Sequence, residues 1–461
     1  MFQLSALDYL FLVQQYKNSL SINTFTLIEN KNQECLIPYI KKNIQRNISN
    51  SIIHSHKITK GFSQKEYPYL IKDKNLDIDN HISSYNLDGL LTEKEKKDLL
   101  KTIYNNKFNT KIPFWELILI YNFDEYGNTA LIRRIPHVIA DGEANAAAFN
   151  MFFDECTLPD IKLKYNKINW FNCKLSNIQK IIKYYGFFIW GFLLKTNDIN
   201  NHIEKSINTQ QSKWIDLKNT KKSYTKVDFK YSNVEKKIKT LGISFTDFCA
   251  YVTSTGYMNY QLSTNETINK KIYASIPISY RKIKSKKPLY GTQAAGIVFD
   301  LNSEELDNLK RLFKIKDSIK QNLILIKKSP IIYYHKAFLN YPFKNKLHKS
   351  IEMLYNTDWN NRRKIPLYNK EQFSIATSVS VKKLTFSHFD YSINNNKILE
   401  TNTFPTIVHS NTSIGFNTMF RVDKEKLILS VCSIDGIIGD SNLLLEMLKK
   451  AVYNLPTLKK I

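Results

Sequence analysis

His137, Asp141 and Gly142 combine residue types and a spacing that can support acid–base catalysis, in the pattern His-x-x-x-Asp-Gly. The unperturbed pKa of histidine lies near neutral, so an imidazole can take a proton from a hydroxyl and return it to a leaving group at cell pH. None of the other eight histidines has an aspartate four residues further on. An isolated histidine at a strand end is more often satisfied by a backbone hydrogen bond, and the residues around it must decide between these two readings.

The sequence around His137 predicts two strands, a loop and a helix. Residues 114–121 and 129–135 are apolar stretches typical of buried strands, and residues 124–128 have turn chemistry, which together predict a hairpin. Pro136 cannot donate to a sheet, so it closes the second strand and leaves His137 on the exit. Asp141 and Gly142 predict the next turn, with glycine tolerating backbone angles that other residues resist. A helix over residues 143–153 follows.

Asp141 lies across this turn from His137. It is expected to orient the imidazole, or else to pair with an arginine and hold the loop in shape. The predicted loop is short and lies between two rigid elements, where a general base is well placed.

Motifs along nearly the whole chain resemble those of the bifunctional wax ester synthase/diacylglycerol acyltransferases. This family lies in the superfamily of acyl-CoA-dependent acyltransferases that includes chloramphenicol acetyltransferase and condensation domains. The similar segments are Leu4-Ser-Ala-Leu-Asp-Tyr-Leu-Phe, Asp77-Ile-Asp-Asn-His, Pro113-Phe-Trp-Glu, the segment around His137, Thr246-Asp247, Ile276-Pro-Ile-Ser-Tyr-Arg, Gly291-Thr-Gln and the residues from Leu427 to the closing leucine-rich segment. The chain departs from the family pattern in three places: Pro136 replaces the first of two consecutive histidines, Thr246 replaces an asparagine, and the family's Ser-Asn-x-x-Gly-Pro segment is only faintly echoed in Ser378-Val-Ser.

The resemblance implies an α/β fold of two chloramphenicol acetyltransferase-like domains, each a mixed sheet flanked by helices, with an active-site tunnel between them. Length agrees, because 461 residues exceed the size of a single core. The predicted division is an amino-terminal domain over 1–194 that carries the motif, a polar interdomain linker over 195–236 and a carboxy-terminal acyltransferase-like domain over 237–461.

The implied reaction moves a fatty acyl group from acyl-CoA to a long-chain alcohol or diacylglycerol, giving wax ester or triacylglycerol. His137 matches the residue to which the family's catalysis is assigned, and Asp141 and Gly142 would shape the active site around it. Motif positions also make substrate-binding candidates of Pro113, Trp115, Glu116, Asp247, Ser279 and Arg281. Packing the hairpin is the alternative for the first three, and a solvated side chain is the alternative for Arg281, which could otherwise pair with Asp141 or a CoA phosphate. No metal or cofactor is expected, with acyl-CoA as co-substrate.

The five cysteines, at positions 35, 156, 173, 249 and 432, show no Cys-x-x-Cys spacing and are odd in number. This pattern argues against a disulfide framework or a zinc site and favours a reducing compartment. The first eight residues lack a basic leader, so a cleaved signal peptide is not expected.

A net charge of +26 invites a nucleic-acid reading, but the lysines are spread along the chain rather than clustered. No specific nucleic acid is expected. A solvated basic surface and attraction to anionic membranes or acyl-CoA phosphates both account for the charge.

Residues 178–195 contain an aromatic and aliphatic run with flanking lysines at positions 180, 183 and 195. The run is shorter than the roughly 20 residues that a membrane span requires. It is expected to form either an interfacial helix or a core helix, and the cationic flanks favour the interface. The expected location is therefore peripheral, on the cytoplasmic side of a membrane (the endoplasmic reticulum or a lipid droplet if the cell is eukaryotic), or the cytosol.

Two other functions stay open at this stage. One is a superfamily acyltransferase with a short-chain donor or a non-lipid acceptor, because sequence does not show the width of a tunnel. The other is a noncatalytic lipid- or nucleic-acid-binding protein with an inert His137, against which the intact motif argues.

Overall fold

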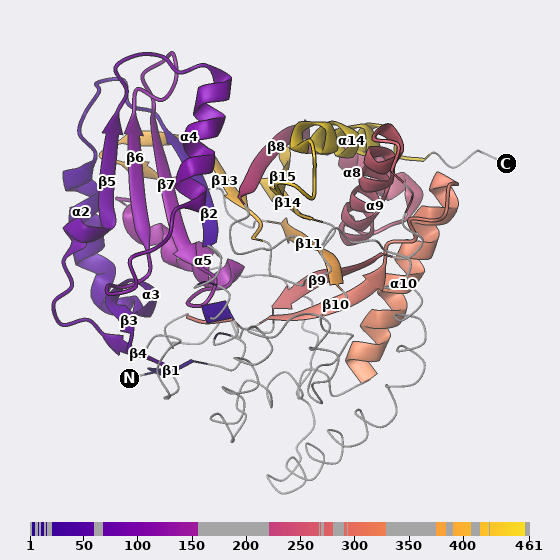
Figure 1. Cartoon of the computed structure of the whole chain (residues 1–461), viewed down its shortest axis with the longest axis horizontal. Helices are drawn as coiled ribbons and strands as arrows, with labels where there is room; N and C mark the ends of the chain where they lie inside the picture. Colours follow the sequence, from indigo (N-terminus) through magenta and orange to yellow (C-terminus); the bar gives the residue numbers. More distant parts are fainter. Residues whose placement is uncertain are drawn as a thin grey trace, which may run out of the picture.

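The computed structural model describes residues 2–4, 8, 11–12, 15, 21–59, 68–154, 221–266, 268, 272–279, 290–292, 294–328, 375–383, 391–406, 415–423 and 425–456. Two six-stranded sheets organise this part of the chain (Figure 1). We call each sheet with the helices packed on it the first and the second domain. Both sheets contain parallel and antiparallel pairs, so the predicted mixed α/β fold is confirmed.

The first sheet has the order β12-β13-β2-β7-β6-β5. Its strands are β2 (Ser21–Ile28), β5 (Ile82–Asn86), β6 (Glu116–Tyr121), β7 (Thr129–Pro136), β12 (Ser392–Ile393) and β13 (Asn396–Phe404). The helices of this part of the chain are α2 (Ile37–Asn47), α3 (Ile52–Ser55), α4 (Glu93–Asn105) and α5 (Gly142–Phe149), with short 3-10 turns η1 (Ile48–Asn50), η2 (Ile78–His81) and η3 (Asn150–Phe152). A small sheet, β1 (Phe2–Gln3), β4 (Tyr69–Lys72) and β3 (His56–Ile58), completes it.

The second sheet has the order β10-β9-β11-β14-β15-β8. Its strands are β8 (Lys222–Lys230), β9 (Tyr273–Ser279), β10 (Ala294–Asp300), β11 (Ile375–Lys383), β14 (Phe416–Asp423) and β15 (Lys426–Ile434). Four helices, α8 (Tyr231–Leu241), α9 (Phe245–Ser263), α10 (Asn308–Lys328) and α14 (Ser441–Tyr453), bury their apolar side chains with it in one core.

The predicted hairpin is present in the first sheet as β6 and β7, which pair antiparallel from Glu116↔Arg134 to Ile120↔Ala130. Alternate residues of β7 enter different cores because side chains alternate across a strand. Leu131 and Ile135 pack with α2 and α5, whereas Ala130 and Ile132 pack with α4. Both faces of β7 are therefore covered, which explains why apolar residues occur on both sides of the strand.

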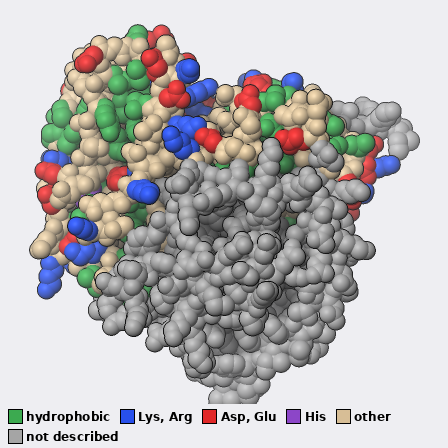
Figure 2. All heavy atoms as spheres, in the orientation of Figure 1, with side chains coloured by type: hydrophobic (Ala, Val, Ile, Leu, Met, Phe, Trp, Pro, Cys, Tyr) green, Lys and Arg blue, Asp and Glu red, His purple; other side chains and the backbone are tan. Residues whose placement is uncertain are grey.

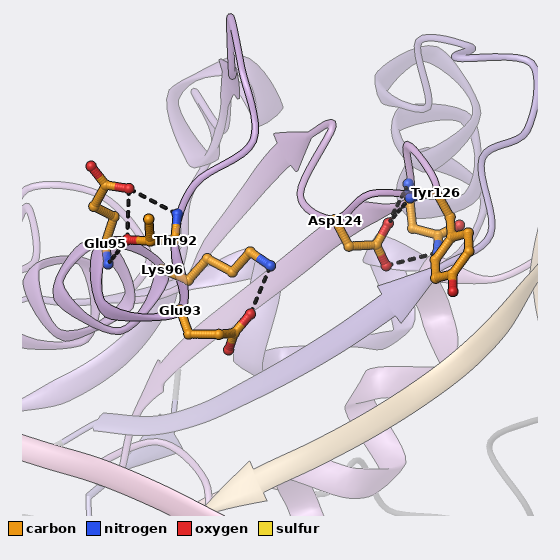
Figure 3. Close-up of polar contacts among 7 residues, drawn as sticks. Thr92, Glu93, Glu95, Lys96, Asp124 and Tyr126 are labelled. Atoms are coloured by element: carbon orange, nitrogen blue, oxygen red, sulfur yellow. Dashed lines mark hydrogen bonds and ion pairs between the residues drawn. The ribbon is translucent and has the colours of Figure 1, made fainter.

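Local polar contacts fix the ends of these elements (Figure 3). The side chain of Asp124 accepts the amides of Tyr126 at 3.1 Å and Asn128 at 3.0 Å, which confirms the predicted hairpin turn. At the start of α4, Thr92 and Glu95 form a reciprocal capping box, in which each side chain accepts the backbone amide of the other residue.

The structure corrects the predicted domain division in two places. Residues 222–236 of the predicted linker form β8 and part of α8, while residues 195–220 of that prediction lie outside the described residues. Polar composition misled the prediction, because β8 is an edge strand and much of its surface is only half buried. In addition, β12 and β13 come from the predicted carboxy-terminal domain but extend the first sheet, where β13 pairs with β2 (Figure 1).

The crossing of β13 to the first sheet brings the two domains into contact. The Ser430 hydroxyl of β15 donates to Asn402 of β13 at 2.8 Å, and Lys226 of β8 forms an ion pair with Glu400. Further along, Asn105 at the end of α4 exchanges two hydrogen bonds with the backbone of Lys222, at 2.9 and 3.0 Å. Such polar contacts hold the sheets in a defined relation to each other.

Gly256 provides a stability test of the second domain. A Cβ on this α9 residue would lie 2.8 Å from the backbone Cα of Leu448 in α14. Because backbone cannot rotate aside, Gly256→Ala should cost about 1–3 kcal/mol through overpacking, more than the gain of roughly 1 kcal/mol in helix propensity. We expect a lower melting temperature by calorimetry.

Gly89→Ala is the matched control, since no described atom lies within 4 Å of its Cβ position. An unchanged or raised melting temperature for Gly256→Ala would refute the close approach of α9 and α14.

Candidate active site

His137 lies on a tight turn between β7 and α5, as the sequence predicted. Pro136 is the last residue of β7 and stands opposite Ser21 of β2. The amide of Ile139 then donates to the carbonyl of Pro136 at 3.2 Å and closes the turn. Only residues 137–141 separate the strand from the helix. The backbone that carries the imidazole is therefore held at both ends. We call residues 137–141 the motif loop.

The His137 imidazole is partly buried. The ring edge meets Phe11, with 4.5 Å between the ring centroids. Its Nδ1 is buried and has no hydrogen-bond partner from another residue in the described part of the chain. Burial lowers the pKa of His137 below its usual value, while the Asp141 carboxylate and the backbone carbonyl of His137 itself oppose that change. The ring is therefore neutral at neutral pH, the form that a general base needs.

Asp141 is the N-cap of α5. Its Oδ1 accepts the amide of Ala144 at 2.9 Å, and its carbonyl accepts the amide of Asn145 at 2.8 Å. The negative charge of a carboxylate at this position also interacts favourably with the positive end of the helix dipole. Of the expected roles, shaping the loop is the one that these bonds support, and the same charge raises the pKa of His137.

Gly142 is the first residue of α5 and is exposed. A Cβ at this position would meet no described atom within 4 Å, and its φ is outside the left-handed region. The expectation that its backbone freedom is used in a turn is therefore wrong, because the turn lies at residues 137–139 and Asp141 is the extended N-cap directly before the helix.

Arg133 is a positioning group that the sequence analysis missed. Its guanidinium is almost fully buried and donates from Nη2 to the carbonyl and the side chain of Asn145 in α5, at 2.7 Å to the carbonyl. It also lies over the Phe149 ring, 4.6 Å from its centroid, and burial lowers its pKa to about 9. An arginine inside an otherwise apolar strand, four residues before the motif histidine, was the available signal. Arg133 and Asp141 together fix α5 from both sides of the motif loop.

The second domain also reaches this loop. The Gly291 amide donates to the Ile139 carbonyl at 2.7 Å, and Ala140 forms a parallel β-bridge with Gly291. On the other side, the Thr292 amide donates to Asp8 at 2.8 Å. The structure thus brings together at the domain junction three segments that match separate motifs in the sequence.

Pro113, Trp115 and Glu116 have packing contacts in the first domain. The Trp115 indole is fully buried, donates to the carbonyl of His54 at 2.9 Å and stacks on His81 with 4.1 Å between centroids. Glu116 forms an ion pair with the buried Arg134, and Pro113 accepts the Trp115 amide. These contacts agree with the alternative that these three residues pack the hairpin.

The remaining candidates are not brought to the motif loop by any described contact. Asp247 forms a capping box with Ser244 at the start of α9, accepting its amide at 2.8 Å. Ser279 ends β9 opposite Ala294, and Arg281 lies outside the described residues. Among the residues that the structure describes, no three His, Cys, Asp or Glu side chains are arranged to hold a metal ion.

Solved structures show which fold this is. A wax ester synthase/diacylglycerol acyltransferase from Marinobacter aquaeolei VT8 is similar over 99% of this chain and 98% of that chain, with 12% identity and a TM-score of 0.64. The first condensation domain of the calcium-dependent antibiotic synthetase covers 99% and 95% of the two chains, with 8% identity and a TM-score of 0.57. The EpoB cyclization-docking bidomain from Sorangium cellulosum covers 99% and 85%, with 10% identity and a TM-score of 0.54. The fold is therefore that of the chloramphenicol acetyltransferase-like proteins, as predicted.

The amino-terminal part of the chain also matches a family model. Residues 4–165 match the model of the wax ester synthase/diacylglycerol acyltransferase catalytic domain, which confirms the resemblance to this acyltransferase family. The matched range contains the whole motif loop and Asp8. No curated protein sequence matches the chain significantly.

Substitution of Asp141 separates its effect as the cap of α5 from its effect on the pKa of His137. Asp141→Asn keeps an oxygen that can accept the Ala144 amide but removes the charge that raises the pKa of His137. Activity that depends on neutral His137 falls as pH drops through this pKa, so the acid limb of the kcat/KM profile should move to lower pH. Asp141→Ala also loses the cap, worth about 0.5–2 kcal/mol, and should lose more activity. pH–rate profiles and melting curves of both variants measure these effects.

An acid limb that does not move in Asp141→Asn would contradict the electrostatic coupling. Equal and complete losses of activity in both variants, each well folded, would show that a negative charge is required for more than the cap.

Proposed function

We propose that this protein transfers a fatty acyl group from acyl-CoA to the hydroxyl of a long-chain alcohol or diacylglycerol, with His137 as the general base. The observation that carries the proposal is a neutral, partly buried histidine on a short loop. The Asp141 cap and the Gly291 amide hold this loop, and it lies within the range that matches the acyltransferase catalytic domain. Both substrates follow from the family resemblance.

The proton path follows from the ring's surroundings. Nδ1 is buried against the backbone, and the carbonyl of His137 itself favours a proton on the ring. With that proton on Nδ1, the lone pair on Nε2 accepts the hydroxyl proton. The alcohol oxygen attacks the thioester carbonyl carbon, the carbon–sulfur bond breaks, and the proton passes from His137 to the departing CoA thiolate. No covalent enzyme intermediate is needed, and the products are an ester and free CoA.

The charge of the protein agrees with a polyanionic donor. The net charge of +26 attracts CoA phosphates over a distance set by the ionic strength. On the face shown in Figure 2, Lys and Arg side chains stand in small groups beside acidic ones.

His137→Ala tests the base directly. Removal of a general base typically costs a factor of about 10² to 10⁴ in rate, so we expect kcat to fall at least a hundredfold. The measurement is release of free thiol from palmitoyl-CoA, with and without hexadecanol or diacylglycerol. CoA affinity and melting temperature should stay near those of the unmodified protein, because the ring makes few polar contacts in the described structure.

Wild-type rates in His137→Ala would refute the mechanism. Thiol release that depends on short-chain donors or amine acceptors, and not on palmitoyl-CoA with lipid alcohols, would replace the proposed substrates with those of another superfamily acyltransferase. Tight binding of lipid without thiol release by the unmodified protein would favour a noncatalytic lipid-binding function.

We also propose peripheral attachment to the cytoplasmic side of a membrane or to a lipid droplet, where such acceptors reside. In the described part of the chain, no helix has the length and apolar character to cross a bilayer. The candidate for attachment is the segment 178–195, which lies outside the described residues. Its support is the aromatic run with lysine flanks in the sequence.

The triple substitution Phe187→Ser, Phe188→Ser and Trp190→Ser tests this attachment. If these rings supply the apolar anchor, the variant should no longer sediment with anionic liposomes, and its melting temperature should change little. High salt should weaken what binding remains, because it screens the lysines.

The matched control replaces three exposed aromatic residues elsewhere, Tyr85, Tyr126 and Tyr453, by serine. Liposome binding of this control should equal that of the unmodified protein. A large fall in melting temperature of the 187/188/190 variant would place the segment in the core and end the membrane proposal.

A further inference from the structure

A backbone hydrogen bond and a β-bridge tie the motif loop to the second domain. The donor is the Gly291 amide and the acceptor is the Ile139 carbonyl, 2.7 Å apart, and Ala140 pairs with Gly291 in a parallel bridge. Ile139 and Ala140 lie between His137 and Asp141. A shift of Gly291 therefore moves the loop that carries the imidazole.

Asp8 holds the other side of this connection. Its Oδ1 accepts the Thr292 amide at 2.8 Å, and the side chain is almost fully buried. A Cβ on Gly291 would lie 2.8 Å from Oδ2 of Asp8. The carboxylate thus sits directly against Gly291, where a side chain would push it away. Gly291 also has a φ of +66°, a conformation that glycine adopts without strain.

The segment around Asp8 contacts the imidazole as well. Phe11, three residues further on, meets the His137 ring at 4.5 Å between centroids. Leu4 and Leu12 on both sides of Asp8 are buried in the same core as Val138 and Ile139. Leu4, Phe11 and Leu12 are thus held by the first domain, and Asp8, which lies between them in sequence, contacts residues 291–292 of the second domain.

We propose that Asp8 is a positioning residue for catalysis: through Thr292 and Gly291 it sets the place of the motif loop, and hence of His137, across the domain junction. The inference rests on the proposed acyl transfer for its kinetic consequences, but the coupling itself is structural and can be measured without activity. Asp8 does not need to touch substrate. Loss of its acceptor oxygen should loosen the loop while the substrate-binding surfaces persist.

The kinetic test compares Asp8→Ala with Asp8→Asn. Misplacement of a catalytic group by about 1 Å can cost roughly 10² in rate, so Asp8→Ala should lower kcat about 10- to 100-fold, with the KM for palmitoyl-CoA within about twofold of the unmodified protein. Asp8→Asn keeps an oxygen for the Thr292 amide and should retain most of the activity. A purely structural role would instead lower the amount of folded enzyme and leave kcat per folded molecule unchanged.

Asp124→Ala is the matched control, because that carboxylate also accepts two backbone amides but lies at the hairpin turn, the opposite end of β7 from His137. Its kcat should equal that of the unmodified protein. Equal kcat values for Asp8→Ala and Asp124→Ala would overturn the proposal, and so would an Asp8→Asn variant as slow as Asp8→Ala.

Hydrogen exchange followed by mass spectrometry gives the second readout. In Asp8→Ala, peptides that cover residues 137–142 and 290–292 should exchange faster, whereas Asp124→Ala should leave them unchanged. If Asp8→Ala does not fold, Gly291→Ala serves instead, because its Cβ would displace the same carboxylate. Unchanged exchange over 137–142 overturns the coupling. Faster exchange in a protein that shows no acyl transfer would refute the proposed function and leave the coupling intact.

Discussion

The hydrogen bond between the Gly291 amide and the Ile139 carbonyl joins the two domains at the motif loop. Its importance comes from the shortness of that loop, which leaves β7 at Pro136 and enters α5 at Gly142. Three further contacts support the same region. Asp141 caps α5, and Arg133 binds Asn145 in the same helix. The strand β13, from the carboxy-terminal part of the chain, pairs with β2 of the first sheet. The proposed role of His137 as general base depends on this redundancy, because small rotations between the domains would otherwise displace the imidazole.

The electrostatics of the site follow from two opposed effects on one ring. Burial disfavours the imidazolium and lowers the pKa of His137, while the Asp141 carboxylate favours the cation and limits the decrease. The result is an imidazole that is neutral at neutral pH, the form that the proposed general base requires. The capping bond to Ala144 keeps the carboxylate in place, so one interaction serves both the helix and the histidine.

Local sequence patterns were sufficient for the elements that border the motif. The apolar strands, the Asp124 turn and the position of Pro136 predicted the hairpin and the loop, because each depends on neighbours in sequence. The pairing of β13 with β2 and the contact of Gly291 with Ile139 join residues far apart in the chain, and no local pattern specifies them. The polar β8 was predicted as linker because an edge strand carries little apolar alternation. The resemblance identified the segments around Asp8 and Gly291, and only the structure showed that they meet.

A crystal structure with a non-cleavable thioether analogue of palmitoyl-CoA and hexadecanol would test the central claim most directly. If His137 is the base, the alcohol oxygen should lie roughly 3 Å from Nε2 of His137, within hydrogen-bonding reach. The carbon bonded to sulfur, which replaces the carbonyl carbon of the thioester, should lie next to that oxygen. Both substrates bound with their reacting atoms away from His137, and the motif loop unchanged, would contradict this account.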